Sequence, residues 1–232
     1  MSSPLEMDVA DSKPHISLRE RKFAKTKLAL LQAALKRLTT KSLSDVTVKE
    51  LCEDVQVSEA TFFNYFPKKD DLLHYFIQIW TLEVLHSARE ATGPEGGLQF
   101  VEHVFDFTGR KLAEHPRLML EIISHMALDP PPSRCEAGSR KLSLAERQQA
   151  LPDCEDFECL NDMKLPDLFH PPLERAVERG ELPASMDVEA AVFGLLSIFF
   201  GVPLLLGCRE PKRIPAMYQQ QLKLLWAGLR AT

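Results

Sequence analysis

The sequence predicts an all-α protein with a small three-helix head near its N-terminal end and a larger helical body. Apolar residues recur at helical spacing through most of the chain, and no stretch alternates apolar and polar residues for the length of a strand. There is no internal repeat. The 232 residues, 45% of them hydrophobic and 26% charged, suit a globular protein of one large or two smaller domains.

A basic helix is expected at residues 18–39, after an N-terminal arm, residues 1–16, whose serines, prolines and mixed charges predict flexibility. Eight basic residues and one acidic residue lie between Arg19 and Lys41, although the whole chain has a net charge of −5. Such a local excess of positive charge favours attraction to phosphate. The alternative interpretation is a solvated surface helix.

Residues 44–73 read as two short helices joined by a tight turn, with a third helix starting at about Lys68. Thr47 and Glu50 have the spacing of a capping box, and Ser58 can cap the second helix. Pro67 ends that helix, because proline disfavours helical geometry in the preceding residue. Small or polar residues remain on its outer side: Glu59, Ala60, Thr61, Asn64 and Tyr65. This pattern predicts a helix-turn-helix whose second helix enters the DNA major groove.

From Thr47 to Leu73 the chain resembles the DNA-binding end of the TetR family of bacterial transcription regulators. The residues that carry the resemblance are Thr47, Val57, Ser58, Thr61, Phe63, Asn64, Tyr65, Phe66, Lys69, Leu72 and Leu73. Two positions depart from the family pattern. Gln56 stands where the family usually has glycine, so a positive φ there costs about 1 kcal/mol. Phe63 replaces the usual tyrosine and lacks its hydroxyl, which leaves it a packing residue near the DNA backbone.

The resemblance implies a cytoplasmic homodimer that binds a double-stranded operator, most simply a repressor released by a small molecule. It assigns the base edges to Lys49, Glu59, Ala60 and Asn64. It assigns phosphates to Thr47, Thr61, Tyr65 and Lys69, with weaker support for Lys25. An activator, a ligand-independent regulator, and an interaction or DNA-organising protein with the same fold are the alternatives.

A domain boundary is expected after the fourth helix, near Gly93-Pro94 and Gly96-Gly97. The helix-turn-helix domain, with its connecting helix, then covers residues 17–90, and the ligand-binding and dimerisation body covers residues 96–232. The body is expected to hold a helix at 98–114, one opened by Pro116, and others at 144–150, 173–179 and 216–229. A proline-rich loop is expected at 129–141.

Residues 190–208 contain no charged residue over 19 positions, which is close to the length that spans a bilayer. The competing interpretation is a helix at a dimer interface, which is where the family places its last two helices. We expect the interface, and its candidate residues are Ala190, Gly194, Ile198, Gly201, Leu222 and Trp226.

The body is also expected to enclose a small, apolar effector, for which the candidate lining residues are Phe105, Met119, Ile123, Met126, Phe169 and Phe193. No cofactor, metal site or enzymatic activity is expected. The sequence has no glycine-rich phosphate loop or nucleophile elbow, and Cys135, Cys154, Cys159 and His170 match no usual zinc spacing. The odd number of cysteines, five, argues for free thiols in a reducing compartment.

Overall fold

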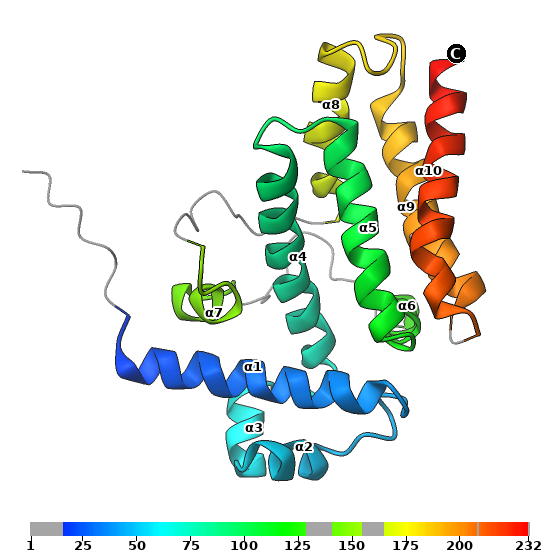
Figure 1. Cartoon of the computed structure of the whole chain (residues 1–232). Coiled ribbons are helices and arrows are strands. Elements are labelled where there is room, and N and C mark those ends of the chain that lie inside the picture. Colours follow the sequence, from blue (N-terminus) through cyan, green and yellow to red (C-terminus); the bar gives the residue numbers. More distant parts are fainter. Residues whose placement is uncertain (1–15, 129–140, 155–164, 208, 232) are drawn as a thin grey trace, which may run out of the picture.

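The computed structural model describes residues 16–128, 141–154, 165–207 and 209–231, and these ranges contain helices and no strand. The head consists of three helices, with α1 lying across α2 and α3 (Figure 1). They are α1 (Leu18–Leu38), α2 (Val48–Val55) and α3 (Glu59–Tyr65). The expected all-α class and three-helix head are therefore confirmed.

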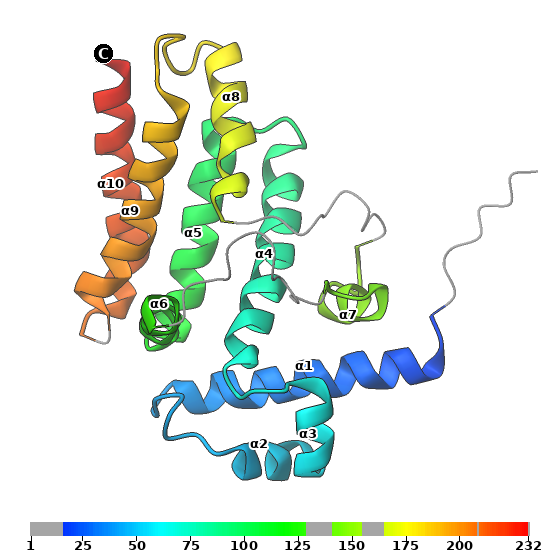
Figure 2. The ribbon, with the colours of Figure 1, turned by 180° about the vertical axis from the view of Figure 1, so that it is seen from behind.

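Helix α4 (Asp71–Thr92) rises from the head into the body, where it packs against α5, and α8, α9 and α10 complete the bundle (Figures 1 and 2). The other body elements are α5 (Leu98–Glu114), α6 (Leu118–Leu128), α7 (Leu144–Ala150), the 3-10 turn η1 (Pro166–Leu168), α8 (His170–Glu178), α9 (Val188–Leu206), the 3-10 turn η2 (Pro211–Arg213) and α10 (Ile214–Arg230). Helix α7 lies on the opposite side of α4 from this bundle and packs against α1 (Figure 2).

Four helices begin two or three residues from the predicted start, among them α6 at Leu118 rather than at Pro116 and α10 at Ile214 rather than near residue 216. Helix α4 starts at Asp71 rather than near Lys68, because the N–H groups of Asp71, Leu72 and Leu73 bond to carbonyls three residues earlier, as in a tight turn rather than an α-helix. Helix α8 starts at His170 rather than at residue 173, since prolines fit the first turn of a helix, whose N–H groups have no internal partner. The flexible arm and the proline-rich loop fall almost entirely outside the described residues.

An aromatic cluster fills the body core. Phe105 stacks on Phe169 at a centroid distance of 5.7 Å and meets Tyr218 edge-on at 5.0 Å. The buried Tyr218 hydroxyl donates to the carbonyl of Phe199 at 2.7 Å, which joins α10 to α9. Helices α5 and α10 approach so closely at Gly109 that a Cβ there would lie 3.1 Å from Cα of Pro215. A larger residue at this position would push α5 and α10 apart by a few tenths of an ångström.

Candidate DNA-binding site

Local hydrogen bonds build the helix-turn-helix as the sequence predicts. The Thr47 hydroxyl accepts from the Glu50 N–H at 3.2 Å, and the Glu50 carboxylate accepts from the Thr47 N–H at 2.9 Å, which completes a capping box. Ser58 caps α3 by accepting from the Thr61 N–H at 3.1 Å. Between the two helices Gln56 adopts φ 58° and ψ 47°. The predicted left-handed turn is therefore present without glycine.

Ion pairs fasten α2 to the end of α1. The Arg37 guanidinium contacts Asp54 at 2.8 Å and Glu50 at 3.1 Å, and the Lys41 ammonium contacts Glu50 at 2.7 Å. The hydrogen bonds from Lys41 and Thr47 lower the pKa of Glu50 to about 2. The hydrogen bond from Arg37 likewise lowers the pKa of Asp54. These carboxylates stay charged at neutral pH and hold α2 in place under α1.

The four candidate base-reading residues are all exposed. Glu59, Ala60 and Asn64 lie on α3, and Lys49 lies on α2. The opposite side of α3 is anchored in the core by Phe62, which is buried, and by Phe66 just after the helix. Phe63 is half exposed, and its ring meets that of Phe62 edge-on at 5.4 Å. Helix α3 thus presents one packed and one open face, as a recognition helix requires.

Two candidate phosphate residues have other partners in the free protein. The Lys69 ammonium donates to the carbonyls of Val46 at 2.9 Å and Ser44 at 3.3 Å. It therefore supports the loop before α2 and has one of its three N–H groups left for phosphate. The Thr47 hydroxyl and backbone N–H both donate to the Glu50 carboxylate. A phosphate would have to compete with this carboxylate for Thr47.

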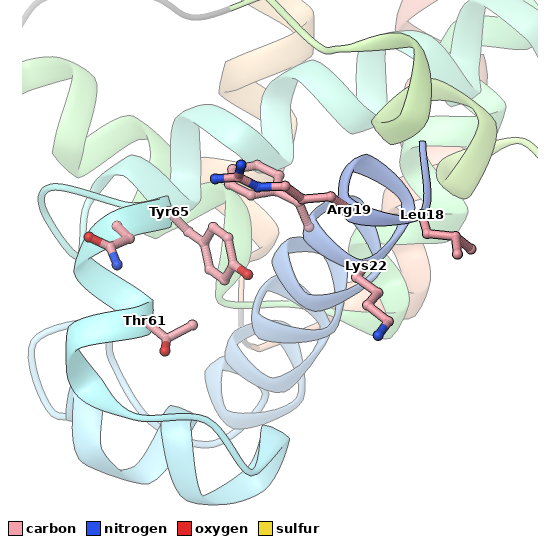
Figure 3. Close-up of a pocket in the computed structure, with 7 residues that line it drawn as sticks. Leu18, Arg19, Lys22, Thr61 and Tyr65 are labelled. Carbon is pink, nitrogen blue, oxygen red and sulfur yellow. The ribbon is translucent and has the colours of Figure 1, made fainter. Parts of the chain in front are cut away.

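A groove of about 590 Å³ runs between the start of α1 and α3. Figure 3 shows Thr61 and Tyr65 of α3 on one side and Arg19 and Lys22 of α1 on the other. Its remaining lining residues are Leu18, Phe23 and Asn64. The ring of Phe23 meets that of Tyr65 edge-on at 4.4 Å, which places α1 beside the recognition helix. Arg19 and Lys22 are thus candidate phosphate contacts that the sequence pattern did not single out, although they belong to its basic helix.

The basic helix has two electrostatic parts. Lys27 is buried and paired with Glu146 of α7, while Arg37 and Lys41 are paired with α2. The exposed cations are concentrated at the start of the helix: Arg19, Arg21, Lys22 and Lys25, with Lys36 near its end. Positive charge available to DNA is therefore smaller than the sequence count implies, and most of it lies beside the groove.

The candidate pocket residues of the body differ in their exposure. Phe105 and Phe169 are buried in the aromatic cluster, and Met119 is buried on α6. Ile123 is half buried, and the side chain of Met126 lies outside the described residues. Phe193 is 74% exposed on α9, so its assignment to a pocket was wrong: the helix turns this ring away from the core.

The candidate interface residues also differ in their exposure. Ala190 is exposed, and Gly194, Ile198 and Gly201 are partly exposed on α9. Leu222 and Trp226 are buried within the subunit, and the Trp226 indole donates to Glu102 of α5 at 3.1 Å. Their assignment to the dimer interface was wrong, because they are buried inside the subunit, where α5 packs against α10. The exposed apolar residues are instead Phe193, Leu204 and Leu205 of α9, with Leu224 of α10.

No group of three or more histidine, cysteine or carboxylate side chains that could hold a metal occurs in the described ranges. Of the four residues considered for a metal, Cys135 and Cys159 lie outside those ranges. Helix α9 is long and apolar enough to cross a membrane by length and composition, and one third of the tested window is buried in the subunit. It packs against α6, α8 and α10.

Comparisons with known proteins agree with this geometry. The family model described as bacterial regulatory proteins, tetR family, matches residues 30–76, which run from the middle of α1 into α4. No curated protein matches the chain significantly in sequence.

Several solved structures resemble most of the chain. One is FadR of Thermus thermophilus, a TetR-family transcriptional repressor in complex with lauroyl-CoA, with 23% identity and a TM-score of 0.54 over 88% of this chain and 94% of FadR. FadR of Bacillus subtilis in complex with stearoyl-CoA gives 15% identity and a TM-score of 0.61 over 87% and 98%. FadR of Bacillus halodurans, a fatty acid degradation regulator, gives 17% and 0.57 over 88% and 96%.

At these identities the likeness shows the fold, whereas the head is matched by its sequence. The head of this chain therefore matches the tetR-family model in sequence over residues 30–76, and most of the chain has the fold of TetR-family regulators.

Proposed function

We propose that this protein is a transcriptional regulator of the TetR family: a cytoplasmic homodimeric repressor that binds a palindromic operator and is released by a small apolar molecule. The observation that carries the DNA-binding part is the open face of α3, with exposed Glu59, Ala60 and Asn64, beside a groove lined by Arg19 and Lys22. In a dimer, two such helices would enter successive major grooves about 34–36 Å apart.

Individual roles follow from side-chain chemistry. The Asn64 amide can pair with an adenine edge, Lys49 suits guanine acceptors, Glu59 can accept from cytosine, and Ala60 can touch a thymine methyl. Arg19, Lys22, Lys25, Thr61 and Tyr65 would contact phosphates, which position the protein without reading sequence. Lys69 would contact a phosphate with its remaining N–H group.

The test is fluorescence anisotropy on a duplex selected from a random library, its single-base variants, and an unrelated duplex, at two or more salt concentrations. Asn64→Ala should cost on the order of 1–3 kcal/mol at one base-pair position in each half-site. Arg19→Ala should weaken binding to every duplex about equally, and should reduce the salt slope by about 1 for each phosphate that the variant no longer neutralises.

Lys223→Ala removes an exposed cation from α10 and is the matched control, which should leave binding unchanged. If Asn64→Ala leaves base preferences unaltered while Arg19→Ala alters them, the two roles have been exchanged. If neither variant affects any duplex, the DNA-binding assignment fails. Regulation of a promoter upward rather than downward by the bound protein would favour the activator alternative.

The dimer part is supported by the exposed apolar side chains of α9 and α10. Phe193, Leu204, Leu205 and Leu224 are between 57% and 82% exposed on two helices that pack together, and exposed apolar side chains on neighbouring helices favour an interaction surface. Leu205→Asp should shift the protein from dimer to monomer in analytical ultracentrifugation. Ala184→Asp, at an exposed position between α8 and α9, is the control and should stay dimeric. Recovery of the wild-type chain only with detergent would instead favour a membrane role for α9.

The effector part is supported by the fold and by the acyl-CoA ligands of the two FadR structures. A body cavity between α4, α5 and α8, lined in part by Leu85, Phe100 and Leu168, has a volume of about 80 Å³. Ordinary ligand pockets occupy roughly 300–1,000 Å³, so an effector there would have to displace side chains. Release from DNA requires that the effector bind more tightly to the state that does not fit the operator.

Lauroyl-CoA and stearoyl-CoA are suitable probes, with coenzyme A alone as the control. An acyl effector should raise the melting temperature and weaken operator binding, whereas coenzyme A should do neither. If all three compounds leave both quantities unchanged, the effector belongs to another chemical class.

A further inference from the structure

Helix α7 belongs to the body in sequence but packs against α1 of the head, and makes a smaller contact with α4 (Figures 1 and 2). Its buried side chains are Ala145 and Glu146, and Leu142 just before it is also buried. A seven-residue helix is too short to be stable alone. The contact between α7 and α1 therefore depends on the side-chain interactions that hold α7 on the head.

The centre of the contact is a buried ion pair. The Lys27 ammonium lies 2.7 Å from Oε1 of Glu146, and the two side chains are 8% and 3% exposed. The same ammonium lies 4.1 Å from the ring centroid of Tyr75 and 5.4 Å from that of Phe66. These rings supply further favourable contacts for a cation. Four elements thus meet at one charge: α1, the end of α3, α4 and α7.

Glu146 is held for this contact from its own side. Its Oε2 accepts hydrogen bonds from the Ser143 N–H at 2.8 Å and the Ser143 hydroxyl at 2.7 Å, and the Glu146 N–H donates to the Ser143 hydroxyl at 3.3 Å, which completes the capping box of α7. Burial acts to raise the pKa of Glu146, but the hydrogen bonds from Lys27 and Ser143 outweigh it and lower the pKa. The carboxylate is therefore charged at neutral pH and opposite Lys27.

A buried ion pair of this kind is a poor source of stability, since an apolar pair of similar volume is often as stable or more so. Its distinctive property is that each charge strongly requires the other. Lys27 cannot stay buried as a cation without Glu146, so the pair links the docking of α7 to the packing of Phe66 and Tyr75. Phe66 directly follows the recognition helix, and Tyr75 lies in the first turns of α4.

We propose that Glu146 is a positioning residue for DNA recognition: through Lys27 it holds α7 on the head and sets the placement of α1 and α3 relative to α4. This inference rests on the proposed DNA-binding function. Two heads of a dimer must present their recognition helices at a fixed spacing. A head that moves on α4 loses affinity for the operator more than for random DNA, because only the operator demands that spacing.

The test compares wild type with Glu146→Gln, which keeps the shape of the side chain and removes its charge. Three quantities are measured on the full chain: amide hydrogen exchange in α7, the melting temperature, and the affinities for selected and unrelated duplexes. Glu146→Gln should speed exchange in α7 and weaken operator binding about tenfold, within the range of coupling between distant sites. Binding to the unrelated duplex and the salt slope should stay as in wild type.

Two further variants separate positioning from stability. Lys27→Met with Glu146→Leu replaces the ion pair by an apolar pair, and should keep α7 protected and the operator bound. Glu83→Gln breaks the ion pair between Glu83 of α4 and Lys111 of α5. It is the matched control, and should lower the melting temperature without changing exchange in α7 or the preference for operator.

Unchanged exchange in Glu146→Gln would overturn the proposal, because the ion pair would then not hold α7. Faster exchange in α7 with an unchanged preference for operator would also overturn it, since the docking of α7 would then have no effect on DNA recognition. Loss of operator binding in the apolar pair with α7 still protected would assign the effect to the charge of Lys27 instead. If the wild type prefers no duplex in its own titration, the proposed DNA-binding function is refuted, whatever the variants show.

Discussion

Gln56 carries the one non-glycine backbone with positive φ among the described residues, and Gln56→Gly is expected to stabilise the head. It ends α2 with φ 58° and ψ 47°, and its N–H lies within reach of the Cys52 and Glu53 carbonyls. The side chain is exposed, so removing it sacrifices little packing. The substitution therefore changes the stability of the protein almost entirely through backbone strain.

Two opposing effects set the magnitude. A side-chain-bearing residue in the left-handed region costs roughly 1–2 kcal/mol, because its Cβ crowds the following carbonyl oxygen. Glycine removes that cost but gives the unfolded chain more freedom, which takes back about 0.5–1 kcal/mol. The net stabilisation is then about 0.5–1 kcal/mol. For a chain of this size it would raise the melting temperature by roughly 1–4 °C.

Urea unfolding and thermal melting of the wild type and variant measure this stabilisation. Gln56→Ala is the control, because alanine keeps the Cβ and should give no stabilisation. Operator binding should be retained in Gln56→Gly, since glycine accepts the same φ and ψ. A variant less stable than wild type would refute the reasoning, and would mean that the Gln56 side chain contributes contacts that outweigh the strain.

Three other substitutions test the geometry of the head. Glu50 has its pKa lowered from 4.5 to about 2 in the folded state, so its stabilisation is complete above pH 4.5 and disappears as the pH falls toward 2. Glu50→Gln should flatten the pH dependence of urea unfolding in that window, and an unchanged profile would contradict the role of Lys41 and Thr47. Lys69→Ala should destabilise the protein by about 1–2 kcal/mol, because the Val46 and Ser44 carbonyls lose a hydrogen-bond donor. It should also weaken binding to all duplexes. Equal urea midpoints for the variant and wild type would show that water replaces the ammonium. Tyr75→Phe should stabilise the protein by about 1 kcal/mol in urea unfolding, since the buried Tyr75 hydroxyl has no hydrogen-bond partner among the described residues, and a decrease in stability would indicate a bound water.

The structure of the head could be predicted from sequence because it depends on interactions between residues close together in the chain. A capping box depends on residues three positions apart, so Thr47 and Glu50 could be paired without knowing the fold, and Ser58 likewise. The left-handed turn at Gln56 followed from the family pattern, and the open face of α3 from helical periodicity and Pro67. In each case the deciding contacts lie within one or two turns of the chain.

The wrong predictions concern what covers the apolar face of a helix: the rest of the subunit, a second subunit or a ligand. Periodicity shows that Leu222 and Trp226 share a face of α10, but only the tertiary structure shows that α5 covers that face. Phe193 is apolar and was placed in the interior, whereas the packing of α9 leaves it exposed. An apolar stripe can meet its own subunit, a partner or a ligand, and these cases have the same sequence pattern.

Short-range spacing was enough to predict the all-α class, the approximate ends of the helices, the helix-turn-helix and the basic first helix. The tertiary structure alone decided which charges of that helix are available to DNA. It buries Lys27 against Glu146, 119 residues away, and turns Lys69 toward the loop before α2. Such pairings depend on how helices distant in sequence pack together, and no local pattern records them.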